Sequence, residues 1–304
     1  MDTERRLARY RDADRWPMEE SLAAMLDNQQ AAFVAVRNAL PALGGAVGQA
    51  AGRLAEDAGR LVYAGAGASG RLAVQDGVEL HPTFDWPHER LVHLLAGGDA
   101  AVTRSLEGAE DDASAGRDEA GALRLGAEDV VVAVAASGTT AFTRAVQAAA
   151  REAGALTVAF ANNPGAPLLA EAEIPVLLHT GPEFLAGSTR MVAGTAQKIA
   201  LNLFSTQLMM ELGRIYQGLM VNVVPSNQKL VDRSHRIVQA ITGCDRPTAA
   251  AAWERAGRDI KLAVLMVDGV GENDARSRLT EARGDLRRAR PIACRTIPSR
   301  ENPR

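Results

Sequence analysis

The most constraining feature of this chain is an apolar run that leads through a glycine-rich loop into a helical pattern. The run Arg60–Ala64 has the length of a buried strand, and the loop reads Gly65-Ala-Gly-Ala-Ser-Gly70. The helical pattern that follows is expected to stop at Pro82. The first N–H groups of such a helix are unpaired and carry partial positive charge, so they attract an anion. The segment therefore predicts an α/β protein with a phosphate site at the tip of a strand.

A second segment repeats this order of elements. The apolar run Asp129–Ala135 leads directly into Ala136-Ser-Gly-Thr-Thr140, and a helical pattern follows over Phe142–Ala153. Hydroxyl and N–H groups from two such loops suit a single phosphate, although serine in either loop can instead serve only as a helix cap. A third segment, Gly187-Ser-Thr-Arg-Met191, is expected to complete the pocket. The candidate phosphate-binding residues are Gly67, Ser69, Ser137, Gly138, Thr139, Thr140, Ser188 and Thr189.

Strands and helices alternate through the middle of the chain. Further strands are predicted at Leu91–Leu95, Ala155–Phe160 and Ile174–Leu178, and a long helix from Gly187 to about residue 212. This alternation is typical of a doubly wound parallel sheet of the flavodoxin-like kind. Such sheets bind ligands beyond the carboxyl ends of their strands, where the glycine and serine loops are expected to lie.

Helical patterns without strand signals flank the predicted sheet. We expect an N-terminal helical segment at residues 1–58, the sheet domain at 59–225, and a small helical domain at 226–290. Residues 291–304 contain three prolines and are predicted to be disordered. The helices of the small domain are predicted at Lys229–Thr242, Arg246–Arg258, Lys261–Val267 and Asn273–Ala289.

The composition favours a cytoplasmic protein that binds neither nucleic acid nor a membrane. The net charge is −3, and no basic stripe alternates with aromatic residues. Cys244 and Cys294 lack a paired motif, which indicates free thiols in a reducing compartment. The first twenty residues are highly charged, and no apolar run is expected to be long enough to span a bilayer.

Acidic residues are the candidate groups for proton transfer. Glu79 follows the first predicted helix, and Glu107 and Glu110 lie in an acidic segment that can also be a solvated turn. The five histidines lack metal-ligand spacing, so no metal is expected. The glycine loop also matches a dinucleotide fingerprint, but Asp85 precedes the second strand instead of ending it. No nicotinamide or flavin cofactor is therefore expected.

Several motifs together resemble the sugar isomerase (SIS) domain, and above all the N-acetylmuramic acid 6-phosphate etherases. The glucokinase regulatory protein of vertebrates is related to that family. The resemblance runs from about residue 18 to about residue 286. It rests on GAGASGRL (65–72), the turn at 79–84, EGAED (107–111), DVVVAVAASG (129–138), GSTRM with AGTAQK (187–198), NQKL (227–230) and TGC (242–244).

The resemblance implies a lyase that cleaves the lactyl ether of N-acetylmuramic acid 6-phosphate in cell-wall recycling. The products are N-acetylglucosamine 6-phosphate and D-lactate. The family route removes the proton at C2 of the open-chain sugar, eliminates lactate from C3 and then adds water. It implies no metal or redox cofactor, and it places the two acid–base glutamates at Glu79 and Glu110. It also implies a homodimer whose site is completed across the subunit interface.

The chain departs from the family pattern at three places. Thr139 replaces an arginine, Val192 replaces a lysine, and Leu80-His81 replaces a pair that usually contains cysteine and proline. The first two changes remove cations from the expected surroundings of an anionic substrate. Two alternatives therefore stay open: a non-catalytic phosphosugar sensor that regulates a partner, and an aldose–ketose phosphosugar isomerase.

Overall fold

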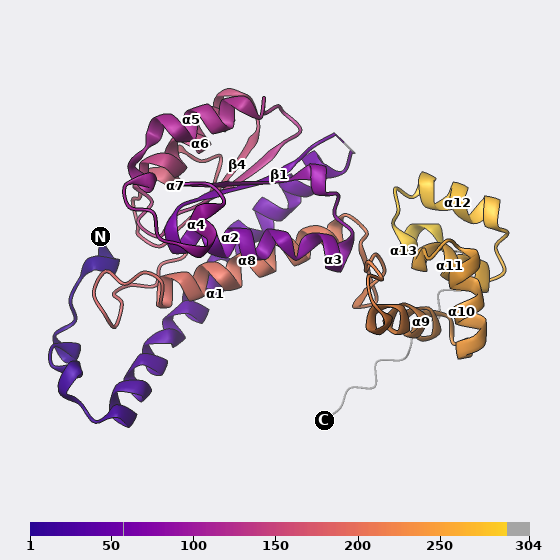
Figure 1. Cartoon of the computed structure of the whole chain (residues 1–304), viewed down its shortest axis with the longest axis horizontal. Helices are drawn as coiled ribbons and strands as arrows, with labels where there is room; N and C mark the ends of the chain where they lie inside the picture. The colour runs from indigo at the N-terminus through magenta and orange to yellow at the C-terminus, as the bar shows by residue number, and fades with distance from the viewer. Residues whose placement is uncertain (57, 291–304) are drawn as a thin grey trace. The chain divides into compact units, whose positions relative to one another are not determined.

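The computed structural model describes residues 1–56 and 58–290. It contains a parallel sheet of five strands in the order β2-β1-β3-β4-β5 (Figure 1). This is the flavodoxin-like order, with β1 and β3 as neighbours at the point where the winding reverses. The predicted fold class is therefore confirmed. The strands are β1 (Leu61–Gly65), β2 (Leu91–Leu95), β3 (Val130–Val134), β4 (Leu156–Ala161) and β5 (Ile174–Leu177).

Helices cover both faces of the sheet. In Figure 1, α5, α6 and α7 lie on one face, and α1, α2 and α8 lie on the other. The strands are continuous apolar runs because both of their faces are buried, and every residue of β3 is fully buried. The bounds are α1 (Met18–Leu54), α2 (Gly67–Val78), α4 (Ala100–Thr103), α5 (Ala113–Ala122), α6 (Ala141–Glu152), α7 (Pro167–Glu171) and α8 (Val192–Glu211).

The described chain forms two compact units. Among the described residues, the first comprises Met1–Glu79 and Pro87–Leu208, and the second comprises Leu80–Trp86 and residues 209–290. The predicted boundary after residue 225 lies inside the second unit, because a hairpin and the residues after it pack into that unit's core. Trp86 and Trp253 are both buried in the second unit. Its elements are α3 (Leu80–Phe84), β6 (Ile215–Tyr216), β7 (Leu219–Met220), α9 (Gln228–Thr242), α10 (Arg246–Arg255), α11 (Ile260–Val267), α12 (Glu272–Glu281) and α13 (Leu286–Ala289).

Several predicted boundaries are wrong. Pro82 does not stop a helix but lies in the first turn of α3, where its missing N–H leaves no hydrogen bond unmade. The long helix begins at Val192 instead of Gly187. The predicted helix Asn273–Ala289 is interrupted between α12 and α13, where Gly284 has a φ of 74°. The short β6–β7 hairpin was not predicted because each strand has only two residues.

Helix α1 is more apolar than expected from the sequence. Among the helices in residues 1–56 and 58–290, α1 alone has the length and the apolar composition to cross a membrane. The expectation that no apolar run is long enough to span a bilayer is therefore wrong. The same measures are met by core helices of soluble proteins. One side of α1 packs under β3, β4 and β5, which accounts for its buried apolar residues but not for those on its exposed side. Cys294 and the tail predicted to be disordered lie outside the described residues.

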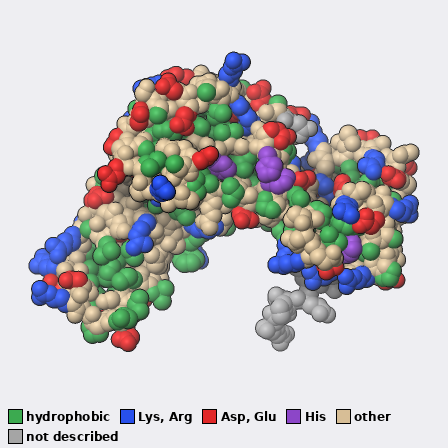
Figure 2. Space-filling view, viewed as in Figure 1, with side chains coloured by type: hydrophobic (Ala, Val, Ile, Leu, Met, Phe, Trp, Pro, Cys, Tyr) green, Lys and Arg blue, Asp and Glu red, His purple; other side chains and the backbone are tan. Residues whose placement is uncertain are grey.

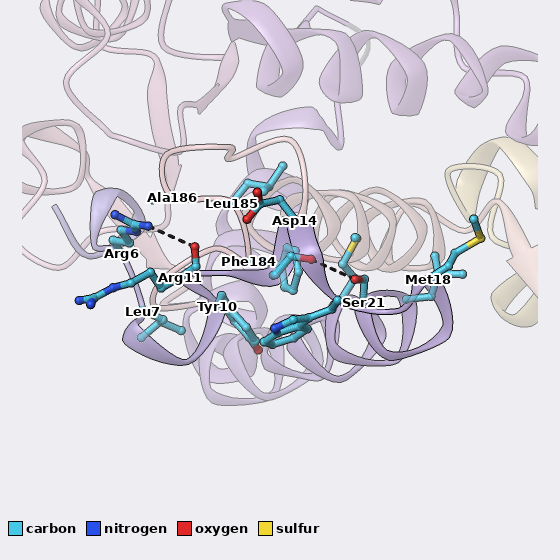
Figure 3. Close-up of a pocket in the computed structure, with 14 residues that line it drawn as sticks. Arg6, Leu7, Tyr10, Arg11, Asp14, Met18, Ser21, Phe184, Leu185 and Ala186 are labelled. Atoms are coloured by element: carbon cyan, nitrogen blue, oxygen red, sulfur yellow. Dashed lines mark hydrogen bonds between the residues drawn. The ribbon is translucent and has the colours of Figure 1, made fainter.

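The segment predicted to be helical, residues 1–58, is not α-helical before α1. It instead contains three short 3₁₀ turns, Asp2–Glu4, Ala8–Tyr10 and Ala13–Arg15. Thr3 is fully buried and donates from its backbone N–H to Asn163 Oδ1 at 3.2 Å. The second and third of these turns, the start of α1 and the loop 184–186 enclose a hollow of about 520 Å³ (Figure 3). We call it the N-terminal hollow. Trp16 lines it as well.

Two glycines of the GxGxxG pattern, Gly65 and Gly70, are packed too tightly for a side chain, and the third, Gly67, has a φ of 54°. The backbone therefore explains the pattern without a dinucleotide. A Cβ on Gly65 would lie 2.8 Å from Gly70 Cα and 3.0 Å from the carbonyl oxygen of Val134. Both contacts are backbone atoms that cannot rotate away. These two glycines therefore bring the first turn of α2 close to the sheet.

Replacing Gly65 with alanine is expected to lower the free energy of unfolding by about 1–3 kcal/mol, because the added methyl overpacks this junction. Gly52→Ala is the matched control, since a Cβ there meets nothing within 4 Å. That change in the interior of α1 should stabilise the protein by about 0.5–1 kcal/mol through helix propensity. Urea denaturation of both variants measures the difference, and equal stability of the two would contradict the packing argument.

Candidate active site

The first two predicted phosphate loops lie at neighbouring strand tips. Gly65 at the end of β1 pairs with Val134 at the end of β3, so the loops that follow leave the sheet side by side. Helix α2 has Ala66 as its N-cap and no side-chain cap hydrogen bond, so Ser69 is not the cap. Ser69 is 8% exposed in the first turn of the helix. The uncapped N-terminus of α2 carries the partial positive charge that favours an anion.

The second loop is shaped by its own hydroxyl groups. Ser137 Oγ accepts from the backbone N–H of Thr139 at 3.2 Å and from Thr139 Oγ1 at 3.1 Å. Gly138 has a φ of 68°, and a Cβ there would lie 2.4 Å from Cβ of Ala166. Thr140 is the N-cap of α6 but makes no side-chain cap hydrogen bond. The loop therefore presents hydroxyls at the start of a helix, as a phosphate site requires.

The third predicted loop differs, because its helix terminus is already occupied by a carboxylate. Glu183 is 1% exposed and accepts from the N–H groups of Val192 and Ala193, each at 2.9 Å. Burial raises the pKa of Glu183, against the effect of these two N–H donors. Ser188 and Thr189 lie in the half-exposed turn before α8 and not at its first N–H groups. They can contribute hydroxyls but not a free helix end.

A hollow of about 230 Å³ brings together two predicted site residues, Gly67 and Glu110. We call it the loop hollow. It lies beside the tips of β1 and β2, and its other wall is the acidic segment from Ser105 to Glu110. Glu110 is exposed in a 3₁₀ turn, Ala109–Asp111, which begins after Gly108 in the left-handed region. The loop hollow thus combines the uncapped start of α2 with a carboxylate.

Arg71 also lines the loop hollow, and it is a residue for which the sequence predicted no role. Its Nε donates to the carbonyl of Ala101 at 2.7 Å, and its Nη2 donates to the carbonyl of Arg104 at 2.8 Å. These bonds hold the guanidinium in place and leave Nη1 for another acceptor. The signal was present in the motif GAGASGRL, where Arg71 lies one turn inside the helix after the loop. It supplies a cation at the loop hollow, beside Gly67 and Glu110.

The second predicted acid, Glu79, lies at the other end of α2. It is the exposed C-cap residue of that helix. The helix has 12 residues and therefore spans about 18 Å. Among the described residues, Glu79 does not line the loop hollow. One chain by itself therefore does not bring Glu79 and Glu110 together.

An apolar hollow runs along the outer side of α2. It has a volume of about 570 Å³ and is lined by residues from Ala68 to Val78, with Val102 and Arg190. We call it the α2 hollow. Arg71 lines both this hollow and the loop hollow. The apolar α2 hollow therefore joins the surroundings of Gly67 to the last turn before Glu79.

The other predicted binding residues lie outside the loop hollow and the α2 hollow. In the part of the chain that the structure describes, Ser69, Ser137, Thr139, Thr140, Ser188 and Thr189 line neither of these hollows. Val192 is fully buried, so at this position the chain has a core residue. No group of three or more metal-ligating side chains occurs among residues 1–56 and 58–290. Cys244 has a free, half-buried thiol.

Comparison with known proteins identifies the domain. Residues 47–150 match the family model of the glucokinase regulatory protein N-terminal SIS domain. Among solved structures, a phosphoheptose isomerase from Francisella tularensis aligns with 64% of this chain and 100% of its own, at 16% identity and a TM-score of 0.43. Likeness at that level identifies neither activity nor substrate.

Curated relatives cover nearly the whole chain. The N-acetylmuramic acid 6-phosphate etherase of Deinococcus radiodurans is 50% identical over 279 residues, which is 91% of both chains. The etherase of Cutibacterium acnes is 44% identical over 286 residues, which is 94% of both chains. Matches of this length include both compact units. The chain belongs to the N-acetylmuramic acid 6-phosphate etherase family.

Proposed function

We propose that this protein is a carbon–oxygen lyase that converts N-acetylmuramic acid 6-phosphate and water into N-acetylglucosamine 6-phosphate and D-lactate. The observation that carries the proposal is the 50% identity to a curated etherase over 91% of both chains. The site chemistry supports it. An elimination beside a carbonyl needs two groups for proton transfer and a substrate held in place.

Each part of the proposed site has a role in that reaction. The uncapped start of α2 at Gly67 and Ser69, with the hydroxyls of Ser137, Thr139 and Thr140, holds the phosphate. Ser188 and Thr189 add hydroxyls from the third loop. Glu79 and Glu110 serve as base and acid: one takes the proton at C2, and the other protonates the lactyl oxygen that leaves C3. Water then adds to the unsaturated aldehyde, and the route as proposed uses no metal.

The two glutamates come from different copies of the chain in a homodimer. Their separation along α2 within one chain supports this arrangement. The apolar α2 hollow supports it too, because Val78 and Val102 are 51% and 41% exposed in one chain. A second exposed face lies along α1, at the lower left of Figure 2. Its members at half exposure or more are Met18, Leu22, Leu26, Phe33, Val34 and Leu40. Apolar surface of this extent indicates a protein interface. As a separate part of the proposal, we place the protein in the cytoplasm.

Release of D-lactate from N-acetylmuramic acid 6-phosphate tests the proposed function. Purified protein is incubated with the substrate, and lactate is measured with an NAD-coupled lactate dehydrogenase while proton NMR follows the sugar. The expected result is lactate and N-acetylglucosamine 6-phosphate in equal amounts. Binding without turnover would instead indicate a phosphosugar sensor, and conversion between an aldose and a ketose phosphate would indicate an isomerase.

Arg71→Met is expected to raise KM about 10- to 100-fold, because a charge-assisted hydrogen bond to an anionic group contributes about 1.5–3 kcal/mol. Arg71→Lys should recover part of this loss, since it keeps the charge but not the fixed fork. Arg144→Met is the matched control, because Arg144 bonds to Glu171 away from the loop hollow. Steady-state lactate release measures all three, and an unchanged KM in Arg71→Met would exclude a substrate contact.

A further inference from the structure

A buried carboxylate lies three residues before Glu79 on helix α2. Asp76 is 3% exposed. Its Oδ2 accepts from the hydroxyl of Tyr63 at 2.9 Å, and its Oδ1 accepts from Asn202 Nδ2 at 2.6 Å and Ser205 Oγ at 3.2 Å. Tyr63 belongs to β1, and the other two donors belong to α8. Three neutral donors from two elements therefore hold one acidic side chain of α2.

Gly77, the residue after Asp76, packs closely against two aromatic rings. A Cβ on Gly77 would lie 2.3 Å from His93 Nε2 and 3.1 Å from Tyr63 Cδ2. The His93 ring stacks on the Tyr63 ring at 6.0 Å, with 11° between the planes. Burial lowers the pKa of His93, which favours the neutral ring. The last turn of α2 therefore rests directly on β1 and β2, with no room for a side chain between them.

Asn202 connects this carboxylate to a cation. Its Oδ1 accepts from Lys198 Nζ at 2.8 Å, and its Nδ2 donates to Asp76. The amide thus lies between the ammonium group and the buried carboxylate, with its dipole aligned to both. Burial and the neighbouring Asp76 hold the pKa of Tyr63 well above its usual range, so the Tyr63 hydroxyl remains a donor. Tyr63, Asn202 and Ser205 therefore all donate to the Asp76 carboxylate.

Glu79 follows this anchored turn immediately. It is the C-cap of α2, and its own N–H donates to the carbonyl of Gly77. Glu79 is also the last residue of the first compact unit before the chain enters the second. Its side chain is exposed and, among the described residues, makes no hydrogen bond that would orient it. The position of its Cα is therefore determined by the turn before it.

We propose that Asp76, held by Tyr63, Asn202 and Ser205, is a positioning residue that places Glu79 for proton transfer. The inference rests on the proposed function, in which Glu79 is one of the two acid–base groups. A shift of about 1 Å in a catalytic group can lower the rate about 100-fold. An anchor at the last turn of α2 is thus expected to act on kcat and not on substrate binding.

The test is an exchange of partners between positions 76 and 202. In Asp76→Asn, one buried donor loses its acceptor whichever way the new amide is turned. In Asp76→Asn with Asn202→Asp, the amide at 76 donates to the carboxylate at 202, which also accepts from Lys198. The oxygen of the amide at 76 still accepts from Tyr63. Ser205 Oγ can bond to the backbone carbonyl of residue 202, which it already approaches at 3.4 Å.

We expect Asp76→Asn to lower kcat about 10- to 100-fold with KM within about twofold, and the exchanged pair to recover most of the loss. Asp129→Asn is the matched control. Asp129 is a buried carboxylate that bonds to Arg60 at the opposite end of the sheet, so its loss should cost stability but not kcat. If Asp76→Asn does not fold, Tyr63→Phe removes one donor and keeps the ring stack.

Amide hydrogen exchange separates this inference from the proposed function. Exchange in a peptide covering 78–80 should rise in Asp76→Asn, return in the exchanged pair, and stay unchanged in Asp129→Asn. If the wild-type protein releases no lactate, the proposed function fails and this readout still reports the anchor. A folded Asp76→Asn with unchanged kcat, or with unchanged exchange at 78–80, would overturn the inference. A loss of kcat that the exchanged pair does not recover would overturn it as well.

Discussion

Mixing two inactive variants, Glu79→Gln and Glu110→Gln, is expected to restore lactate release. Each substitution alone removes a proton-transfer group and should lower kcat by several orders of magnitude, while phosphosugar binding is nearly unchanged. In one chain Glu79 is the C-cap of α2, whereas Glu110 lines the loop hollow at the start of that helix. The helix between these two places spans about 18 Å. If a site takes Glu79 from one subunit and Glu110 from the other, a mixed dimer has one site with both glutamates intact.

The amount of recovery is itself a prediction. Random exchange of equal amounts makes half of the dimers mixed, and each of these has one working site of two, so about a quarter of wild-type activity returns. The two variants are denatured together, refolded and assayed, and each variant refolded alone is the control. Absence of recovery in dimers shown by mass spectrometry to be mixed would place both glutamates in the same chain's site.

The largest expected loss of stability comes from the second unit, at the pair Arg290 and Asp268. Their side chains are 3% and 7% exposed and are joined by two hydrogen bonds of 2.8 and 2.9 Å. A third bond runs from Arg290 Nη1 to the Tyr216 hydroxyl at 3.0 Å. The hydrogen bonds to Asp268, and a further one to Tyr216, raise the pKa of Arg290. Asp268→Asn leaves a buried cation without its counter-charge, and we expect it to lower the free energy of unfolding by about 3–5 kcal/mol.

Two comparisons test the cause of that loss. Replacing both members by apolar residues, in Asp268→Leu with Arg290→Met, should cost much less, because no buried charge remains. Glu272→Gln breaks the exposed pair with Arg276 in the same unit and should change stability by less than about 1 kcal/mol. Urea titrations of the three variants supply the values. A similar cost for Asp268→Asn and Glu272→Gln would show that burial does not set the energy of this pair.

The sheet and its two phosphate loops could be predicted because each depends on local pattern. The runs at Arg60–Ala64 and Asp129–Ala135 are short, apolar and followed by glycine, which are the features that define a parallel strand and its tip. Their adjacency follows from the winding of such sheets. The start of α8 at Val192 could not be predicted, because it depends on Glu183 reaching back from another loop to accept from its first N–H groups.

The arrangement of the candidate site was harder to predict than its composition. Glu79 and Glu110 were both assigned from motifs, but sequence spacing does not say that a helix separates them. Arg71 was in a quoted motif and still received no role, because its importance depends on the carbonyls of Ala101 and Arg104. Asp76 looked like any polar residue of a helix until its three partners were known. Contacts between distant segments decide these cases.

The positions of the indole rings give the two compact units separate optical reporters. The chain has three tryptophans. Trp16 lines the N-terminal hollow of the first unit, whereas Trp86 and Trp253 are 1% and 0% exposed in the second. In a protein with Trp16 replaced by phenylalanine, intrinsic fluorescence reports on the second unit alone. Conversely, a chain that keeps only Trp16 reports on the first unit, so cooperativity of the two units in melting can be read from emission spectra.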